Sequence, residues 1–278
     1  MLSNAGTAEF DSARMRCRRI GAHVAAACAN ALRAALPQNC SLCAEASGDA
    51  LLCDACMRGM PRTGESCPRC ASASPGGAIC GACLAAPPPQ AATVAAWRYA
   101  FPADRLLHAF KYRGRLALAE PLADAIVAAV NARGTAVPDL LLAVPLARSR
   151  QRVRGYNHAQ EIARRVSSRL GVPLANGLRR VRDAPPQAGS DLAARARNVR
   201  GAFAAMMRHD GLAVAIVDDV MTTGATLAAA AAAMRDSGAT RVEAWVVART
   251  PPPRRADRGE GDASNPPPAH AAVDASDA

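Results

Sequence analysis

The sequence predicts an α/β domain with a mainly parallel sheet, preceded by a small cysteine-rich domain. From residue 92 onward, short apolar runs alternate with segments of helical periodicity, which is typical of strand–helix units. Eight of the ten cysteines fall into four Cys-x-x-Cys units between residues 40 and 83. A chain of 278 residues has room for one medium domain and one small one.

Residues 1–36 are expected to form an amphipathic helical region. Four arginines precede an apolar stretch over residues 20–36, but Arg33 interrupts that stretch and no cleavage pattern follows it. A secretory signal is therefore not expected. No segment offers about 18 uninterrupted apolar residues, so a membrane span is not expected either. Docking onto the following domain is the preferred interpretation, with contact at a membrane surface as the weaker one.

The Cys-x-x-Cys units recur every 13 or 14 residues, at Cys40/Cys43, Cys53/Cys56, Cys67/Cys70 and Cys80/Cys83. The two-residue spacer lets both thiolates of a unit point at one ion, so two units complete a tetrahedral zinc site with four cysteine ligands. The residues between the units are too poor in apolar side chains to fold without metal. The sequence predicts two structural zinc ions in a domain over residues 37–86. Sequential pairing of the units is preferred, and a cross-brace arrangement stays open.

A proline-rich tract at residues 85–89 marks the boundary before a second domain, expected over residues 92–250. Strands are expected at 93–100, 140–144, 202–207, 212–217 and 242–248, and helices at 104–112, 116–132, 157–170 and 226–237. The run over 140–144 is wholly apolar and ends at Pro145, the profile of a buried parallel strand. Ligands of such sheets bind at the carboxyl ends of the strands. Residues 251–278 are expected to be a disordered tail.

The segment after the expected strand 212–217 has the composition of a site for a sugar phosphate. Asp218 and Asp219 come first, and Thr222-Thr223-Gly224-Ala225-Thr226 then turns into a helix. A turn and a helix N-terminus present backbone N–H groups to a phosphate, and Gly224 permits close approach. The carboxylates can accept hydrogen bonds from ribose hydroxyls or help to hold Mg²⁺. An ordinary capped helix is the alternative, but a cap needs one such residue and not an acidic pair followed by three threonines.

Residues 217–226, Val-Asp-Asp-Val-Met-Thr-Thr-Gly-Ala-Thr, resemble the phosphoribosyl-pyrophosphate (PRPP) motif of type I phosphoribosyltransferases. The resemblance implies a type I phosphoribosyltransferase-like sheet that binds PRPP together with Mg²⁺. It implies that Asp218 and Asp219 contact the ribose. It also implies that the 5-phosphate is held by Thr222, Thr223, Gly224, Ala225 and Thr226.

Two arginine-rich segments are further candidates. The first follows the expected strand 140–144, where the type I transferase layout has its pyrophosphate loop. Arg148 and Arg154 are expected to bind pyrophosphate there, with a solvated basic loop as the alternative. The second, residues 180–203, is expected to be a mobile active-site loop, with a disordered basic insert as the alternative.

The order of the motifs along the chain indicates a narrower family than the type I phosphoribosyltransferases as a whole. The cysteine units precede Phe110-Lys111-Tyr112-Arg113-Gly114, then Arg154-Gly155-Tyr156-Asn157-His158-Ala159, then Gln187 with Arg195 and Asn198, then the PRPP motif. Over residues 30–250 this order resembles the ComF family of competence proteins, although Ala184 and Ser190-Asp191-Leu192 depart from the family pattern. The resemblance implies a cytoplasmic bacterial protein of DNA uptake, with single-stranded DNA and other competence or DNA-processing proteins as partners. Peripheral contact with the inner face of the membrane stays open.

Several functions remain open at this point. The net charge of +11 favours polyanionic partners, although the base composition of the genome explains an arginine-rich and alanine-rich chain equally well. An active transferase would use Asp218, Asp219, Arg148 and Arg154 as catalytic groups. The preferred interpretation is a PRPP-binding, phosphoribosyltransferase-like protein that acts in DNA uptake. The alternatives are an enzyme of nucleotide metabolism unrelated to DNA uptake and a PRPP sensor without catalysis.

Overall fold

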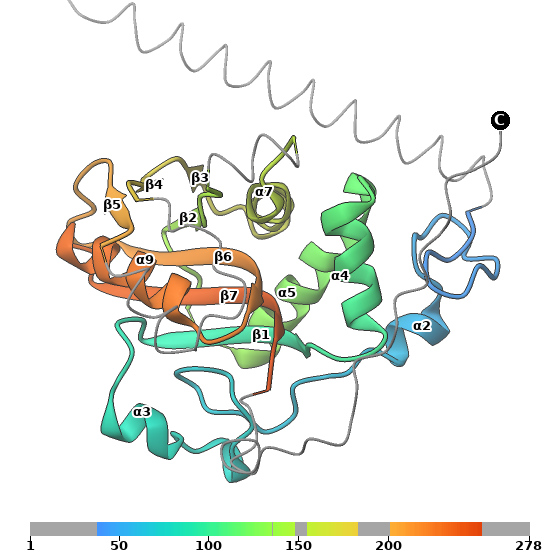
Figure 1. Cartoon of the computed structure of the whole chain (residues 1–278), viewed down its shortest axis with the longest axis horizontal. Helices are drawn as coiled ribbons and strands as arrows, with labels where there is room; N and C mark the ends of the chain where they lie inside the picture. Colours follow the sequence, from blue (N-terminus) through green and yellow to red (C-terminus); the bar gives the residue numbers. More distant parts are fainter. Residues whose placement is uncertain (1–37, 135, 148–154, 183–200, 252–278) are drawn as a thin grey trace, which may run out of the picture.

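The fold is built around a five-stranded sheet (Figure 1). The computed structural model describes residues 38–134, 136–147, 155–182 and 201–251. Within them the strands lie in the order β1-β7-β6-β2-β3, and every neighbouring pair is parallel. The strands are β1 (Ala92–Arg98), β2 (Leu140–Ala143), β3 (Leu174–Ala175), β6 (Ala213–Met221) and β7 (Arg241–Arg249). The predicted α/β class with a parallel sheet is confirmed.

The main helices of this part are α4 (Ala103–Tyr112), α5 (Ala119–Arg133), α7 (His158–Leu170) and α9 (Ala225–Asp236). Helix α7 connects β2 to β3, and α9 connects β6 to β7, in the opposite direction across the sheet. Because such crossovers are right-handed, α7 and α9 cover opposite faces. Helix α5 packs beside α7, and the direction of the connections reverses between β6 and β2. Such a reversal is where open α/β sheets bind ligands.

Strand β6 differs from its predicted extent. It continues to Met221, four residues past the expected end at Val217, because β7 stays paired with it as far as Arg249. On the other side, β2 pairs with β6 only as far as Val217, and Pro145 follows shortly after in the chain. The end of β6 is therefore supported by β7 on one edge and is not covered by β2 on the other.

Two short strands lie outside the main sheet. Phe203–Ala205 (β5) falls within the expected strand at 202–207 but pairs antiparallel with β4 (Leu178–Arg180). Neither β3 nor β4 was predicted, because strands of two or three residues carry too little periodicity to be recognised. The helix expected at 116–132 is a short 3₁₀ turn, η2 (Leu116–Leu118), followed by α5.

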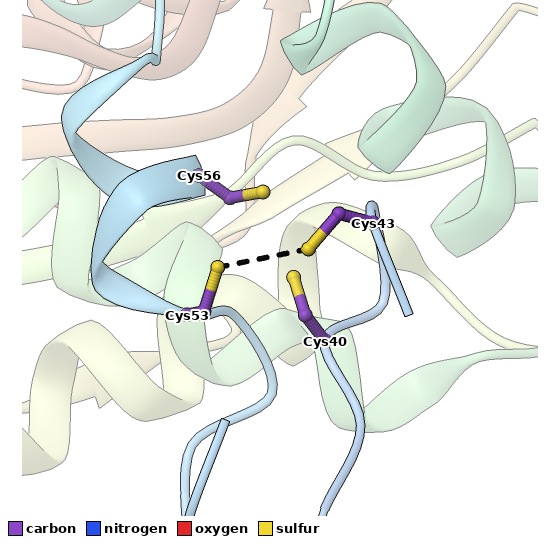
Figure 2. A group of neighbouring side chains, drawn as sticks. All are labelled: Cys40, Cys43, Cys53 and Cys56. Carbon is purple, nitrogen blue, oxygen red and sulfur yellow. Dashed lines mark hydrogen bonds between the residues drawn. The ribbon is translucent and has the colours of Figure 1, made fainter. Parts of the chain in front are cut away.

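Residues 38–86 contain little regular structure and repeat one pattern twice. An isolated bridge, Asn39 to Ala46 and then Ser66 to Ala73, is followed each time by a five-residue helix. The helices are α2 (Asp54–Arg58) and α3 (Gly81–Ala85), and each begins directly after a cysteine; η1 (Pro75–Gly77) is a further 3₁₀ turn. Each repeat gathers four cysteines, of which Figure 2 shows the first group.

The cysteine-rich segment runs along the edge strand β1. Arg62 forms a bridge with Trp97, and the Thr93 hydroxyl donates to the Arg69 carbonyl at 2.7 Å. The Thr93 N–H donates to the Pro68 carbonyl at 2.9 Å. An uncovered strand edge invites pairing with other chains, so this segment protects the sheet as well as carrying its own cysteines.

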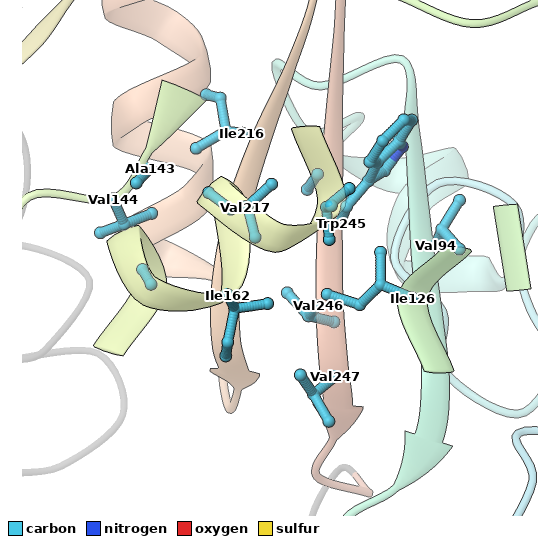
Figure 3. Packing of buried hydrophobic residues seen from close by; sticks show 14 of the residues in the cluster. Val94, Ile126, Ala143, Val144, Ile162, Ile216, Val217, Trp245, Val246 and Val247 are labelled. Atoms are coloured by element: carbon cyan, nitrogen blue, oxygen red, sulfur yellow. The ribbon is translucent and has the colours of Figure 1, made fainter. Parts of the chain in front are cut away.

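The core lies between the central strands and the helices. The buried cluster in Figure 3 includes Val246 and Val247 of β7, Ile216 and Val217 of β6, and Ile162 of α7. Strands buried on both faces explain why these segments are continuous apolar runs. Among the described residues, no helix is long and apolar enough to cross a bilayer. The expected N-terminal helix and C-terminal tail lie outside the described residues.

Candidate functional site

A cavity of about 490 Å³ lies at the carboxyl ends of β2 and β6, where the strand connections reverse. Seven segments of the chain meet around it. They are Tyr99 after β1, Lys111 and Tyr112 at the end of α4, residues 144–147 after β2, residues 157–159 at the start of α7, Arg180 of β4, the end of β6 with the turn after it, and Thr250 after β7. Asp218, Asp219, Thr222 and Thr226 all line the cavity.

The acidic pair is held in two different environments. The Lys111 ammonium lies 2.8 Å from the Asp219 carboxylate, and both side chains are largely buried. Asp218 accepts a hydrogen bond from the backbone N–H of Asp219 at 2.8 Å. Burial, together with the neighbouring Asp219 carboxylate, raises the pKa of Asp218 to about 7. Among the described residues, Lys111 is the one cation that forms an ion pair with these two carboxylates, so a bound cation would further favour their charged forms.

The turn after β6 depends on a glycine. Gly224 begins α9 with φ 82°, a left-handed conformation that side-chain-bearing residues rarely adopt. An added Cβ would also lie 2.5 Å from the Cε atom of Met221. The Thr223 hydroxyl accepts a hydrogen bond from the Ala225 N–H at 3.3 Å. Thr222 and Thr226 line the cavity, whereas Thr223, Gly224 and Ala225 shape the turn beside it.

Residues 155–157 hold the walls of the cavity together. The Asn157 side chain caps α7 by accepting from the N–H groups of Ala159 and Gln160. Its amide also donates to the Val144 carbonyl at 3.0 Å, which ties the helix to the end of β2. The Tyr156 hydroxyl donates to the Phe110 carbonyl at 2.6 Å, next to Lys111. The family motif quoted above therefore has a positioning role that sequence reasoning did not assign.

The eight cysteines form two groups of four, each with its Sγ atoms within 4.8 Å of one another. Cys43 and Cys53 Sγ lie 3.7 Å apart, and Cys70 and Cys80 Sγ lie 3.6 Å apart. Sulfurs bound tetrahedrally at about 2.3 Å would lie about 3.8 Å apart, so both groups fit a zinc ion. The groups follow the sequential pairing, Cys40/43/53/56 and Cys67/70/80/83, and not the cross-brace.

The thiols of each group differ in acidity. Burial opposes ionisation of Cys40, but backbone N–H groups of Cys43, Cys53 and Leu42 lower its pKa to about 6, and Cys67 is lowered to about 6 in the same way. Burial and neighbouring thiols instead raise the pKa of Cys56 to about 12, and that of Cys83 also rises. Four neighbouring thiols cannot all ionise without a cation between them. A structural zinc ion would supply that cation and bind the four thiolates.

Comparison with known proteins supports both parts of the chain. A double zinc ribbon domain matches residues 31–84, and a phosphoribosyl transferase domain matches residues 155–264. DNA utilization protein YhgH of Escherichia coli (strain K12) is 32% identical over 217 residues, which are 76% of this chain and 90% of that protein. Competence protein F of Haemophilus influenzae is 32% identical over 159 residues, which are 54% of this chain and 69% of that protein. The chain belongs to the ComF family.

This membership confirms the resemblance inferred from the order of motifs, and the two four-cysteine groups are consistent with the two structural zinc ions of a double zinc ribbon. Among solved structures, a purine phosphoribosyltransferase from Pyrococcus horikoshii aligns with 47% of this ComF chain and 71% of its own, at 19% identity and a TM-score of 0.30. That similarity is too low to argue from.

The sequence-based site is only partly within the described residues of this ComF protein. Arg148 and Arg154 lie outside them, as does most of the second arginine-rich segment, so their roles stay predictions. Arg180, Tyr99 and Asn157 also line the cavity. Arg180 begins the second arginine-rich segment and Asn157 belongs to the quoted family motif, but none of the three was assigned a role of its own from the sequence. Arg249 was missed as well. Its one signal is a charged residue that follows the apolar run over residues 244–248.

Proposed function

We propose that the cavity binds PRPP together with Mg²⁺ and that the protein serves DNA uptake or DNA utilization. The observation that carries the proposal is the meeting of four motif residues, Asp218, Asp219, Thr222 and Thr226, in one cavity at the strand switch point. The names of the relatives, DNA utilization protein and competence protein, support the cellular role.

The 5-phosphate is assigned to the turn between β6 and α9. Helix α9 has twelve residues, so its first N–H groups and its dipole favour an anion. Thr222 and Thr226 line the same cavity, and their hydroxyls would add donors. Gly224 keeps the turn free of a side chain where the phosphate would approach.

The ribose hydroxyls are assigned to the carboxylates of Asp218 and Asp219. Among the described residues β2 pairs with β6 only as far as Val217, and Asp218 and Asp219, which follow, line the cavity. The same carboxylates would help to hold Mg²⁺, which would supply positive charge for the leaving pyrophosphate. Lys111 balances Asp219 in the ligand-free protein and lies close enough to contact the ligand.

If the protein transfers the phosphoribosyl group, the bond between the anomeric carbon and the pyrophosphate oxygen breaks, and pyrophosphate leaves with the electron pair. The acceptor donates a lone pair to the same carbon. Positive charge then develops on the ribose ring, where Asp218 and Asp219 stabilise it. Arg148 and Arg154 remain the proposed partners of the leaving pyrophosphate.

The proposal is tested by calorimetric titration of Mg²⁺-PRPP into the zinc-loaded protein and into Asp218→Asn/Asp219→Asn. Loss of two charged hydrogen-bond acceptors should weaken binding by roughly 100-fold or more. Asp210→Asn is the matched control, because Asp210 pairs with Arg208 on the exposed surface and does not line the cavity. Absence of binding to the folded, zinc-loaded wild type would contradict the proposal.

Single-stranded DNA is proposed as the polyanionic partner. Only 3% of the residues are aromatic, yet exposed aromatic side chains gather at this end of the sheet. Tyr99 and Tyr112 line the cavity and are 38% and 61% exposed, and Phe101 close by in the chain is 74% exposed. Aromatic rings of this kind stack on bases, while the basic surface of the chain contacts phosphates.

A further inference from the structure

Arg249 connects the second cysteine group to the turn after β6. Its side chain is 7% exposed at the end of β7, and its Nε donates to the Cys70 carbonyl at 2.9 Å. Nη2 donates to the Ser72 hydroxyl at 3.2 Å. On its other side, Nη1 donates to the carbonyls of Met221, at 3.2 Å, and Thr222. One buried guanidinium thus joins two segments that are far apart in the chain.

The charge of this guanidinium needs a partner. A buried cation is costly unless an anion compensates it. Among the described residues, no carboxylate forms an ion pair with Arg249. Arg249 instead contacts the backbone of Cys70, and negative charge on Cys70, Cys80 and Cys83 would favour its charged form. With zinc bound, four thiolates and one Zn²⁺ would carry a net charge of about −2, so the second cysteine group would supply the compensating anion.

The carbonyls that Arg249 holds belong to the site proposed for the phosphate. Met221 ends β6, and Thr222 begins the turn and lines the cavity. When the carbonyls of a turn are fixed on one side, its N–H groups are held toward the other. The first cysteine group has no such connection: within the described chain, none of its four cysteines hydrogen-bonds to residues 221–226.

We propose that Arg249 is a positioning residue through which zinc at Cys67, Cys70, Cys80 and Cys83 orders the turn over residues 221–226. Zinc would fix the position of the Cys70 carbonyl, and its thiolate ligands would supply the compensating charge. Both would hold the Arg249 guanidinium in place, and the guanidinium holds the carbonyls of the turn. The ordering of the turn does not depend on the proposed function. Only its consequence, that loss of zinc from the second site weakens PRPP binding, rests on the proposed function.

Amide hydrogen exchange over residues 221–226, read by mass spectrometry on the full chain, tests the ordering without PRPP. We expect Arg249→Met to speed this exchange at least tenfold and to release one of the two zinc ions at a lower chelator concentration. Arg249→Lys should show both effects more weakly than Arg249→Met, because lysine keeps the positive charge but lacks the forked donors of a guanidinium. Arg241→Met is the matched control, since Arg241 begins the same strand and donates to the Ala136 carbonyl at 2.8 Å, far from both sites.

The two zinc sites provide a second comparison that does not depend on the folding of an Arg249 variant. Cys67→Ser/Cys70→Ser should speed exchange at residues 221–226, whereas Cys40→Ser/Cys43→Ser should not. In the Cys40→Ser/Cys43→Ser chain, stripping zinc and restoring it should raise and then lower the exchange rate. Equal effects of the two double variants, or wild-type exchange in a folded Arg249→Met protein, would overturn the proposal.

Calorimetry with Mg²⁺-PRPP on the same proteins separates this inference from the proposed function. We expect affinity to fall about tenfold in Arg249→Met and to be unchanged in Arg241→Met. A wild type that binds no PRPP but shows the zinc-dependent exchange would support the coupling and contradict the proposed ligand.

Discussion

At the scale of single residues, Asp218 shows how a binding site costs stability. Its pKa is about 7 in the folded protein and about 3.9 in an unfolded chain. A raised folded-state pKa gives a favourable contribution that is complete below the unfolded value and is lost as the pH rises through about 7. The ligand-free protein therefore keeps a carboxylate that weakens its own fold at neutral pH and above.

We predict that Asp218→Asn gains stability relative to the wild type as the pH rises. The asparagine can still accept the Asp219 N–H, but it never ionises. The melting temperature of the ligand-free variant minus that of the ligand-free wild type should be larger at pH 8 than at pH 5. Thermal unfolding at both values measures this. A constant difference between the two proteins would show that Asp218 does not titrate in this range.

Gly224→Ala should damage both stability and binding. The strained φ of 82° costs about 1–2 kcal/mol for a residue with a Cβ, and Met221 must move to make room. Gly134→Ala is a matched control: Gly134 has φ 63° at the end of α5, with open space around an added Cβ. Both variants should lose stability in urea unfolding, but only Gly224→Ala should lose affinity for Mg²⁺-PRPP.

At the scale of elements, the sequence predicted most of the sheet and its main helices, because apolar runs and glycine stops mark them directly. It placed the end of β6 at Val217, since polar residues begin there, whereas backbone pairing with β7 carries the strand on to Met221. Backbone hydrogen bonds do not depend on side-chain character, so periodicity could not reveal this extension. The contacts of Tyr156, Asn157 and Arg249 were unpredictable for a similar reason, because each joins elements distant in the chain.

Asn157 links the start of α7 to the end of β2, so its substitution tests how this helix start is stabilised. Asn157→Ala removes both the cap of α7 and the link to Val144, and we expect a loss of about 1–2 kcal/mol in the free energy of unfolding. Asn157→Asp keeps the cap acceptor and loses only the donor to Val144. Urea unfolding and PRPP titration of both variants would separate the two roles. Equal stability of Asn157→Ala and the wild type would contradict this account of the helix start.

At the scale of the whole molecule, a zinc-binding segment covers one edge of a parallel sheet and reaches, through Arg249, the far end of two central strands. The cysteine spacing predicted the two metal sites from local sequence alone. It could not predict that the second site lies beside the proposed phosphate turn, since that placement depends on the packing of the two parts.

The net charge of +11 belongs to this scale as well. If single-stranded DNA is held mainly through its phosphates, the logarithm of affinity should fall linearly with the logarithm of salt concentration, by about 0.7 for each phosphate contacted. Fluorescence anisotropy across a salt series measures this slope. Phe101→Ala should weaken binding at every salt concentration without changing the slope, because stacking releases no counterions. An affinity that does not respond to salt would argue against DNA as the partner.

Binding of PRPP where β6 turns into α9 can be seen most directly in a crystal structure of the protein grown with Mg²⁺-PRPP. We expect the 5-phosphate against residues 222–226 and the ribose hydroxyls against Asp218 and Asp219. Ligand density elsewhere on the molecule, or an empty cavity at saturating PRPP, would contradict this proposal.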